Sequence, residues 1–174
     1  AFQMIDGIAE RLALTFKEIN PEKTTSVEIM KYGLIMTFNG SSVIVISLLA
    51  GWFNERFIET LITLIAFAVF RFFSGGYHFN SALICILFSS ALMIAIPYVH
   101  LSSNAILILN LISIVLTLLY APSRIENQTR IPKRYFPLLK WISVVIVTSN
   151  YIFLSPILAA IFFVQSIMLV QLRR

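Results

Sequence analysis

The sequence has 174 residues and a net charge of +5; 59% of its residues are hydrophobic and only 12% are charged. Soluble domains carry about 25% charged residues, and a chain of this length cannot bury so much apolar surface in one aqueous core. The composition excludes a soluble protein and predicts an integral membrane protein. The basic charge does not indicate nucleic-acid binding, because no stacking aromatics are interleaved with the basic residues.

The first segment in chain order is amphipathic. Residues 1–19 repeat apolar side chains at helical spacing, with charged residues on the other face. Asn20-Pro21 ends this helix, because the residue before a proline avoids the helical region. Residues 1–31 are therefore expected to form a cytoplasmic segment with an N-terminal amphipathic helix. This helix either lies on the inner leaflet or offers a docking surface to an amphipathic peptide.

Long stretches without Asp, Glu, Lys or Arg follow, at residues 32–54, 72–123 and 141–172. A membrane-spanning helix needs roughly 20 apolar residues. Together with the apolar run between residues 61 and 70, these stretches predict about six transmembrane helices, at residues 33–53, 57–73, 80–98, 104–120, 138–154 and 156–172. The fold class is therefore an all-α polytopic membrane bundle, one domain over residues 1–174 with the bundle at 32–172. Small and hydroxyl residues in the spans favour helix packing and leave a homodimer open.

The basic residues orient the bundle. Loops on one side carry Arg71, the basic stretch 124–140 and Arg173-Arg174, whereas the other side carries only Arg56. Because Lys and Arg gather on the cytoplasmic side, we expect the first set of loops and both termini in the cytoplasm. The basic stretch would contact anionic headgroups of the lipid bilayer.

Known catalytic spacings are nearly all missing from the sequence. It has no His-Glu-x-x-His pair, no Gly-x-Ser-x-Gly elbow, no phosphate-binding loop and no dinucleotide fingerprint. Two histidines and one cysteine cannot form a closed structural zinc site in the usual way, so we expect no metal and no cofactor. Residues 71–85, between the second and third spans, remain as the candidate site.

This candidate site holds the only cysteine, Cys85, seven residues after His78. A cysteine nucleophile acts as a thiolate, and a nearby imidazole is a common means of producing it. On one unbroken helix the two side chains would lie about 10 Å apart, whereas proton transfer needs roughly 3 Å. A working pair therefore requires a turn, which Gly75-Gly76 permits and which Asn80 would end as the N-cap of the next helix. The alternative is an inert, buried Cys85 and an ordinary interfacial His78.

Arg71, Ser74-Gly75-Gly76, His78 and Cys85 together resemble the signature of the accessory gene regulator B (AgrB) family, the membrane peptidases of Gram-positive quorum sensing. Ala121-Pro122 before a basic loop also agrees with the family. The residues after Ala121-Pro122 depart from it, because the usual Asn-x-Pro-like segment is missing.

The resemblance implies a cysteine endopeptidase, a thiol protease of the cell membrane of a Gram-positive bacterium, with its active site on the cytoplasmic side. His78 and Cys85 would be its catalytic pair. The substrate would be an AgrD-like propeptide. The enzyme would cleave off the propeptide's acidic C-terminal tail and, through an acyl-enzyme thioester, close the signal segment into a thiolactone or lactone.

Further residues take supporting roles under this resemblance. Arg71 would be structural or would bind a tail carboxylate. Gly75 and Gly76 would shape the loop, and their backbone N–H groups would help to form an oxyanion hole. Asn80 would cap the helix or orient His78. Four basic residues would attract the acidic tail, namely Arg124, Arg130, Lys133 and Arg134.

Two other functional classes fit the same pattern. A peptide exporter or transporter would need ionisable residues inside its spans, which the charge-free stretches disfavour. A membrane scaffold without enzymatic activity is compatible with every residue. A thiol-reactive probe separates these alternatives, because a catalytic Cys85 reacts quickly near neutral pH and a packing cysteine does not.

Overall fold

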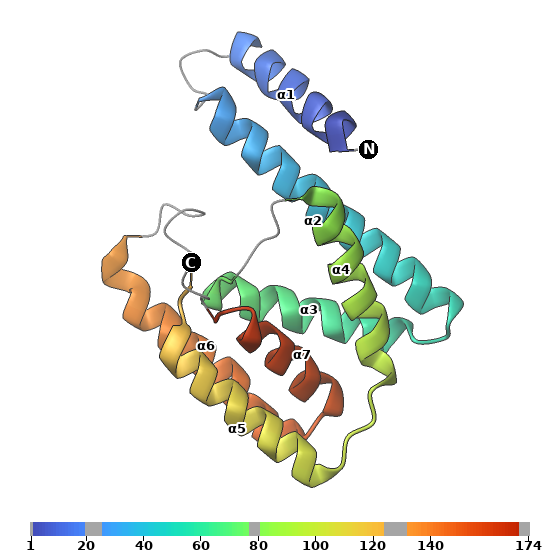
Figure 1. The fold of residues 1–174 in the computed structure, drawn as a ribbon, viewed down its shortest axis with the longest axis vertical. Coiled ribbons are helices and arrows are strands. Elements are labelled where there is room, and N and C mark those ends of the chain that lie inside the picture. Colours follow the sequence, from blue (N-terminus) through green and yellow to red (C-terminus); the bar gives the residue numbers. More distant parts are fainter. Residues whose placement is uncertain (1, 20–25, 77–80, 124–131, 171–174) are drawn as a thin grey trace.

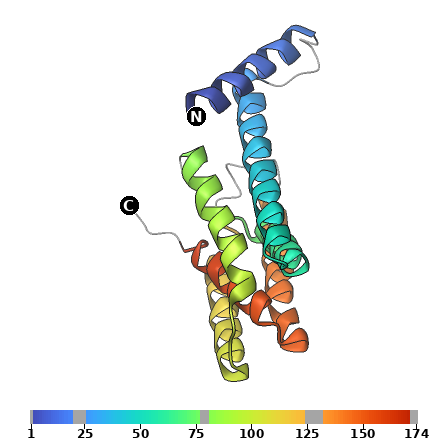
Figure 2. The ribbon, with the colours of Figure 1, turned by 90° about the vertical axis from the view of Figure 1, so that its right-hand side faces the viewer.

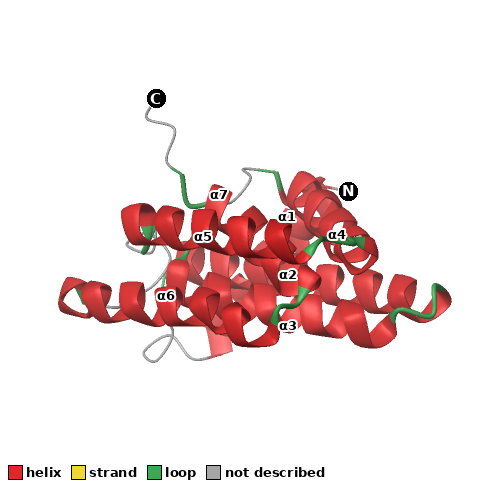
Figure 3. Cartoon of the chain, turned by 90° about the horizontal axis from the view of Figure 1, so that it is seen from below, coloured by secondary structure: helices red, strands yellow, loops and turns green. Residues whose placement is uncertain are grey.

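The structure, a computed structural model, describes residues 2–19, 26–76, 81–123 and 132–170. These residues form seven α-helices and two short 3-10 helices: α1 (Phe2–Ile19), α2 (Val27–Phe53), α3 (Phe57–Ser74), α4 (Ala82–Ala95), η1 (Ile96–Tyr98), α5 (Ser103–Tyr120), η3 (Lys133–Tyr135), α6 (Phe136–Phe153) and α7 (Pro156–Ile167). Figure 3 shows helices joined by short loops throughout the described part of the chain. The predicted all-α membrane bundle is confirmed.

Four of these helical segments are long and apolar enough to cross a bilayer: α2, α3, α5 and residues 133–153, which join η3 to α6. The apolar segments Ala82–Tyr98 and Pro156–Ile167 are shorter. The predicted span at 156–172 is wrong in length, because α7 has 12 residues and rises only about 18 Å against roughly 30 Å of hydrocarbon. Half of its residues are buried, so protein rather than lipid surrounds much of this helix.

Serine side chains cap the N-termini of four helices. Ser26, Ser81, Ser102 and Ser155 each accept a hydrogen bond from the backbone N–H three residues later, at 3.4 to 3.5 Å. This satisfies one of the N–H groups that a helix leaves unpaired at its start. The expectation that Asn80 caps the third span is wrong, because Ser81 is the N-cap of α4.

Helix α3 lies at the centre of the bundle (Figure 1), with α2 packed on one side and α6 and α7 on the other. Figure 2 shows α1 (blue) and α5 (yellow) toward opposite ends of the molecule's long axis. Helix α4 packs on α2, and α5 covers α7. The core around α3 includes Phe70 and Phe162, whose ring centroids lie 5.4 Å apart in an edge-to-face arrangement. This packing brings the last residues of α3, α5 and α7 to one end of the bundle, which we call the glycine end because it contains Gly75.

Polar contacts hold the opposite end together. Asn150 of α6 is fully buried, and its Nδ2 donates to Asn110 Oδ1 of α5 and to the Ser155 carbonyl, both at 3.1 Å. The Ser155 N–H donates back to Asn150 Oδ1 at 3.0 Å, which closes the turn between α6 and α7. Asn110 therefore serves helix packing.

Helix α1 packs across the first part of α2 (Figure 1). Its contact uses small residues, because Ala9 and Ala13 are fully buried. Glu10 accepts a hydrogen bond from Lys31 Nζ at 2.8 Å, and this bond and the Lys31 charge hold the pKa of Glu10 below its ordinary value of 4.5. Ile8 and Phe16 stay about half exposed, so an apolar face remains for a leaflet or a peptide.

Candidate active site

The Gly75-Gly76 turn ends α3 in a backbone conformation that suits glycine. The Gly75 N–H donates to the Arg71 carbonyl at 2.9 Å, and φ is 71° at Gly75 and 135° at Gly76. Residues with a Cβ rarely adopt such positive φ values. The predicted break between the second and third spans is therefore present in the structure.

A segment distant in sequence holds this turn by main-chain hydrogen bonds. The Ser123 N–H donates to the Ser74 carbonyl at 2.9 Å, and the Gly76 N–H donates to the Ser123 carbonyl at 3.0 Å, as in a parallel β-bridge. Because the N–H groups of Gly75 and Gly76 already donate to protein carbonyls, they are not available to an oxyanion. The expectation that they form an oxyanion hole is wrong.

Gln165 of α7 contacts the same turn from the other side. Its side chain is fully buried, and its Nε2 donates to the Gly75 carbonyl at 2.7 Å and to Ser74 Oγ at 3.4 Å. Its Oε1 accepts a hydrogen bond from Arg71 Nη1 at 3.1 Å. Gln165 is not among the site residues that the sequence predicts; the available signal was an amide within a mostly apolar helix, which is costly in a membrane protein unless it has partners.

Arg71 lies near both the Gly75-Gly76 turn and Cys85. Its guanidinium carbon lies 5.4 Å from the centre of the Phe67 ring. The guanidinium is close enough to Cys85 on α4 and to Tyr32 on α2 to attract either group in its ionised form. Cys85 is the fourth residue of α4, is half-buried, and has its N–H bonded to the Ser81 carbonyl at 3.0 Å. Three of the predicted site residues (Arg71, Gly75 and Gly76) thus adjoin one another, and Cys85 lies within electrostatic range of Arg71.

Several predicted site residues lie outside the described residues, namely His78, Asn80, Arg124 and Arg130. The contact between His78 and Cys85 therefore stays a prediction. Of the remaining basic candidates, Lys133 and Arg134 are exposed in η3, where Arg134 Nη2 donates to the Tyr135 hydroxyl at 3.0 Å. Within the ranges that the structure describes, no three His, Cys, Asp or Glu side chains gather as a metal site requires.

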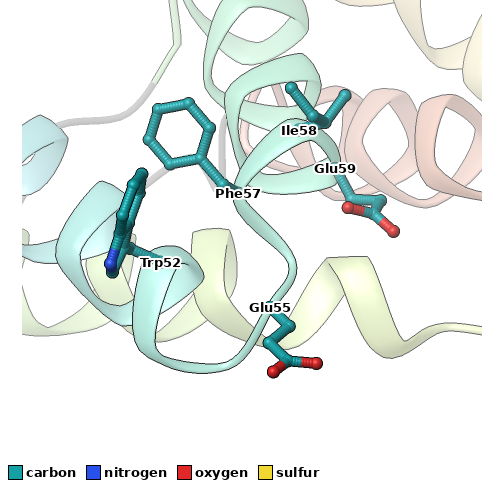
Figure 4. Close-up of a pocket in the computed structure, with 5 residues that line it drawn as sticks. All are labelled: Trp52, Glu55, Phe57, Ile58 and Glu59. Atoms are coloured by element: carbon teal, nitrogen blue, oxygen red, sulfur yellow. The ribbon is translucent and has the colours of Figure 1, made fainter.

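Two surface hollows among the described residues lie elsewhere in the bundle. One is lined by Trp52, Glu55, Phe57, Ile58 and Glu59, at the connection between α2 and α3 (Figure 4). This connection is at the other end of α3 from Gly75. A second, apolar hollow lies between α3 and the helices α6 and α7, and Cys85 lines neither of them.

Comparisons with known proteins relate most of the chain to one family. The profile of the family described as accessory gene regulator B matches residues 5–172. The chain is 29% identical over 138 residues to an accessory gene regulator protein B of Staphylococcus epidermidis, covering 77% of this chain and 60% of that protein. It is also 32% identical over 100 residues to a protein of the same name from Staphylococcus aureus, covering 55% and 53% of the two chains.

A putative AgrB-like protein of Halalkalibacterium halodurans is 28% identical over 101 residues, covering 58% of this chain and 51% of that protein. The chain thus spans about 60% of the length of the Staphylococcus epidermidis relative. No solved structure matches the chain.

Proposed function

Since the chain belongs to the accessory gene regulator B family, we propose that it is a membrane cysteine endopeptidase that matures a peptide signal in bacterial quorum sensing. His78 and Cys85 form the catalytic pair in this proposal. Its main support is the family to which residues 5–172 belong, and Cys85 is half-buried in the first turn of α4. The Gly75-Gly76 turn next to Arg71 supports it further, because the chain there leaves helical geometry two residues before His78.

The proposed reaction begins with proton transfer from the Cys85 thiol to the imidazole of His78. The thiolate attacks the carbonyl carbon at the end of the signal segment of an AgrD-like propeptide. The C–N bond then breaks, and the acidic tail leaves with the proton from His78 on its new amine. An acyl-enzyme thioester on Cys85 remains.

A thiol within the signal segment completes the reaction by attacking this thioester. A cyclic thiolactone forms, and the Cys85 sulfur leaves and regains a proton. Where the signal segment carries a serine, the same step gives a lactone. The internal nucleophile competes well with water because it has a high effective concentration, and a site near the membrane surface excludes water.

The glycine end is cytoplasmic in this proposal, because Lys and Arg favour that side. Exposed Lys133 and Arg134 lie in η3, before α6, and with Arg124 and Arg130 they give the loop after α5 a positive charge. An acidic substrate tail would be attracted to this loop, mainly during encounter. Arg71 provides a positive charge near Cys85, where the reaction generates negative charge.

The experiment is cleavage of a synthetic precursor by the full chain in liposomes, with Cys85→Ala and His78→Ala as the test variants. Both should lose tail release. Ser89→Ala and His100→Ala are matched controls, because Ser89 is half-buried one turn further along α4 and His100 lies in the connection between η1 and α5. Cleavage at the wild-type rate by either test variant would show that the catalytic pair is assigned wrongly.

A further inference from the structure

The amide of Gln165 is the polar group from α7 that contacts the turn of the candidate site. Burying an amide costs free energy unless it is hydrogen-bonded, and Gln165 is fully buried. Within the described part of the chain, its three hydrogen-bond partners lie between residues 71 and 75: the Arg71 guanidinium, the Ser74 hydroxyl and the Gly75 carbonyl. The amide therefore joins the last turn of α3 to α7.

A glutamine suits this position because one amide both donates and accepts. Its Nε2 donates to the Gly75 carbonyl, and its Oε1 accepts from Arg71, so the two groups are held at the two ends of one rigid, planar amide. A methionine has a similar length and neither function. An ionised glutamate would keep the acceptor for Arg71 but would place an oxygen against the Gly75 carbonyl.

The contact is also close to Gly76. A Cβ at Gly76 would lie 3.1 Å from Gln165 Nε2 and 3.5 Å from Arg71 Nη1. The turn and the amide are therefore in close contact, so a shift of one displaces the other. His78 follows Gly76 by two residues in the sequence, so this turn is the described segment from which the chain continues to His78.

We propose that Gln165 is a positioning residue of the peptidase: its amide fixes the Gly75-Gly76 turn against Arg71 and thereby sets the point from which the chain leads to His78. This role rests on the proposed function. Gln165 acts through the turn and contacts neither substrate nor the reacting sulfur. Misplacing a catalytic group by about 1 Å can cost on the order of a hundredfold in rate, so this amide affects turnover strongly.

The test compares Gln165→Met with Ser166→Ala in the full chain in liposomes. Ser166 is the neighbouring buried residue of α7, but its hydroxyl bonds to Ser113 and Thr117 of α5 and not to the turn. Ser166→Ala therefore controls for lost packing of α7. Three quantities are measured: kcat and KM for tail release from a synthetic precursor, the pH profile of Cys85 alkylation by iodoacetamide, and unfolding by SDS.

Gln165→Met should lower kcat at least about tenfold and leave KM within about twofold. Its alkylation profile should move toward that of His78→Ala, whereas Ser166→Ala should keep the wild-type profile with a similar loss of stability. If Gln165→Met does not fold, Gln165→Glu replaces it, because this variant keeps the side-chain length and the bond from Arg71. It should show the same loss of kcat.

A purely structural role predicts a different pattern. Wild-type kcat and an unchanged alkylation profile in Gln165→Met, or in Gln165→Glu, would overturn the positioning role. The proposed function would survive that result as long as Cys85→Ala and His78→Ala are inactive. Wild-type cleavage by Cys85→Ala would instead overturn both proposals, so the two failures are distinguishable.

Discussion

Gly76→Ala should destabilise the bundle through the turn at the end of α3. Gly76 has φ of 135°, a conformation that residues with a Cβ rarely adopt. The added Cβ would also lie 3.1 Å from Gln165 Nε2 and 3.6 Å from the Met168 carbonyl oxygen. The amide would have to move away by a few tenths of an ångström, which weakens its 2.7 Å hydrogen bond to the Gly75 carbonyl.

The two effects set the expected magnitude. A residue held in a sparsely populated backbone region costs about 1–3 kcal/mol. Loss of the hydrogen bond adds about 1 kcal/mol. Gly76→Ala should therefore lower the free energy of unfolding by about 2–4 kcal/mol, the sum of these two effects.

Unfolding by SDS in mixed micelles, followed by tryptophan fluorescence, measures this change. Gly40→Ala is the matched control, because Gly40 lies within α2 and a Cβ there would meet nothing within 4 Å. Alanine is the better helix former, so this control should be unchanged or more stable by up to about 1 kcal/mol. Equal stabilities for the two variants would refute the strained conformation at Gly76 and its contact with Gln165.

Three further predictions concern other parts of the bundle. Gly51→Ala should destabilise the α2–α3 hairpin by about 1–3 kcal/mol in the same SDS assay, because its Cβ would meet Thr60 Oγ1 at 2.7 Å; a value equal to the Gly40→Ala control would contradict this. Asn150→Leu should lower the free energy of unfolding by about 1–3 kcal/mol, because its two bonds with Ser155 at the α6–α7 turn and its bond to Asn110 of α5 disappear and leave buried groups unpaired; unchanged unfolding would show that those bonds contribute nothing. Lys31 lowers the pKa of Glu10, so this ion pair should stabilise the contact between α1 and α2 fully above pH 4.5 and lose its contribution as the pH falls through the lowered pKa. Hydrogen exchange of the α1 amides would detect the loss. Glu10→Gln should remove the pH dependence of this exchange, and an unchanged pH dependence in that variant would contradict the role of Glu10.

Much of the candidate site could be predicted from local sequence. The pair Gly75-Gly76 predicts a break in helical geometry, because glycine tolerates positive φ, and both residues have it. The N-cap of the next helix is Ser81 rather than Asn80. Both residue types are good N-caps, so the local sequence does not decide between them. The predicted oxyanion hole failed for a different reason. Whether an N–H group is available depends on its partner, and the partner of Gly76 is Ser123, which lies far along the sequence.

Gln165 shows the limit of the sequence more directly. A lone amide in an apolar helix indicates a partner but does not identify it, because the chain has many carbonyls and hydroxyls that could serve. Only the packing of α7 against α3 brings Gln165 to Arg71 and Gly75. Its contacts join residues about 90 positions apart, and no helical or turn periodicity reaches that far.

The sequence by itself determined the membrane bundle, the family and most helix boundaries, because these depend on hydropathy over about 20 residues, on local capping and on a short motif. The tertiary structure decided which residues of the helices are buried and which helix ends lie next to one another. It limited α7 to 12 residues with half of them buried, brought Arg71 near Cys85, and held the Gly75-Gly76 turn with Ser123 and Gln165. These features arise from packing between distant segments, which single-residue propensities do not encode.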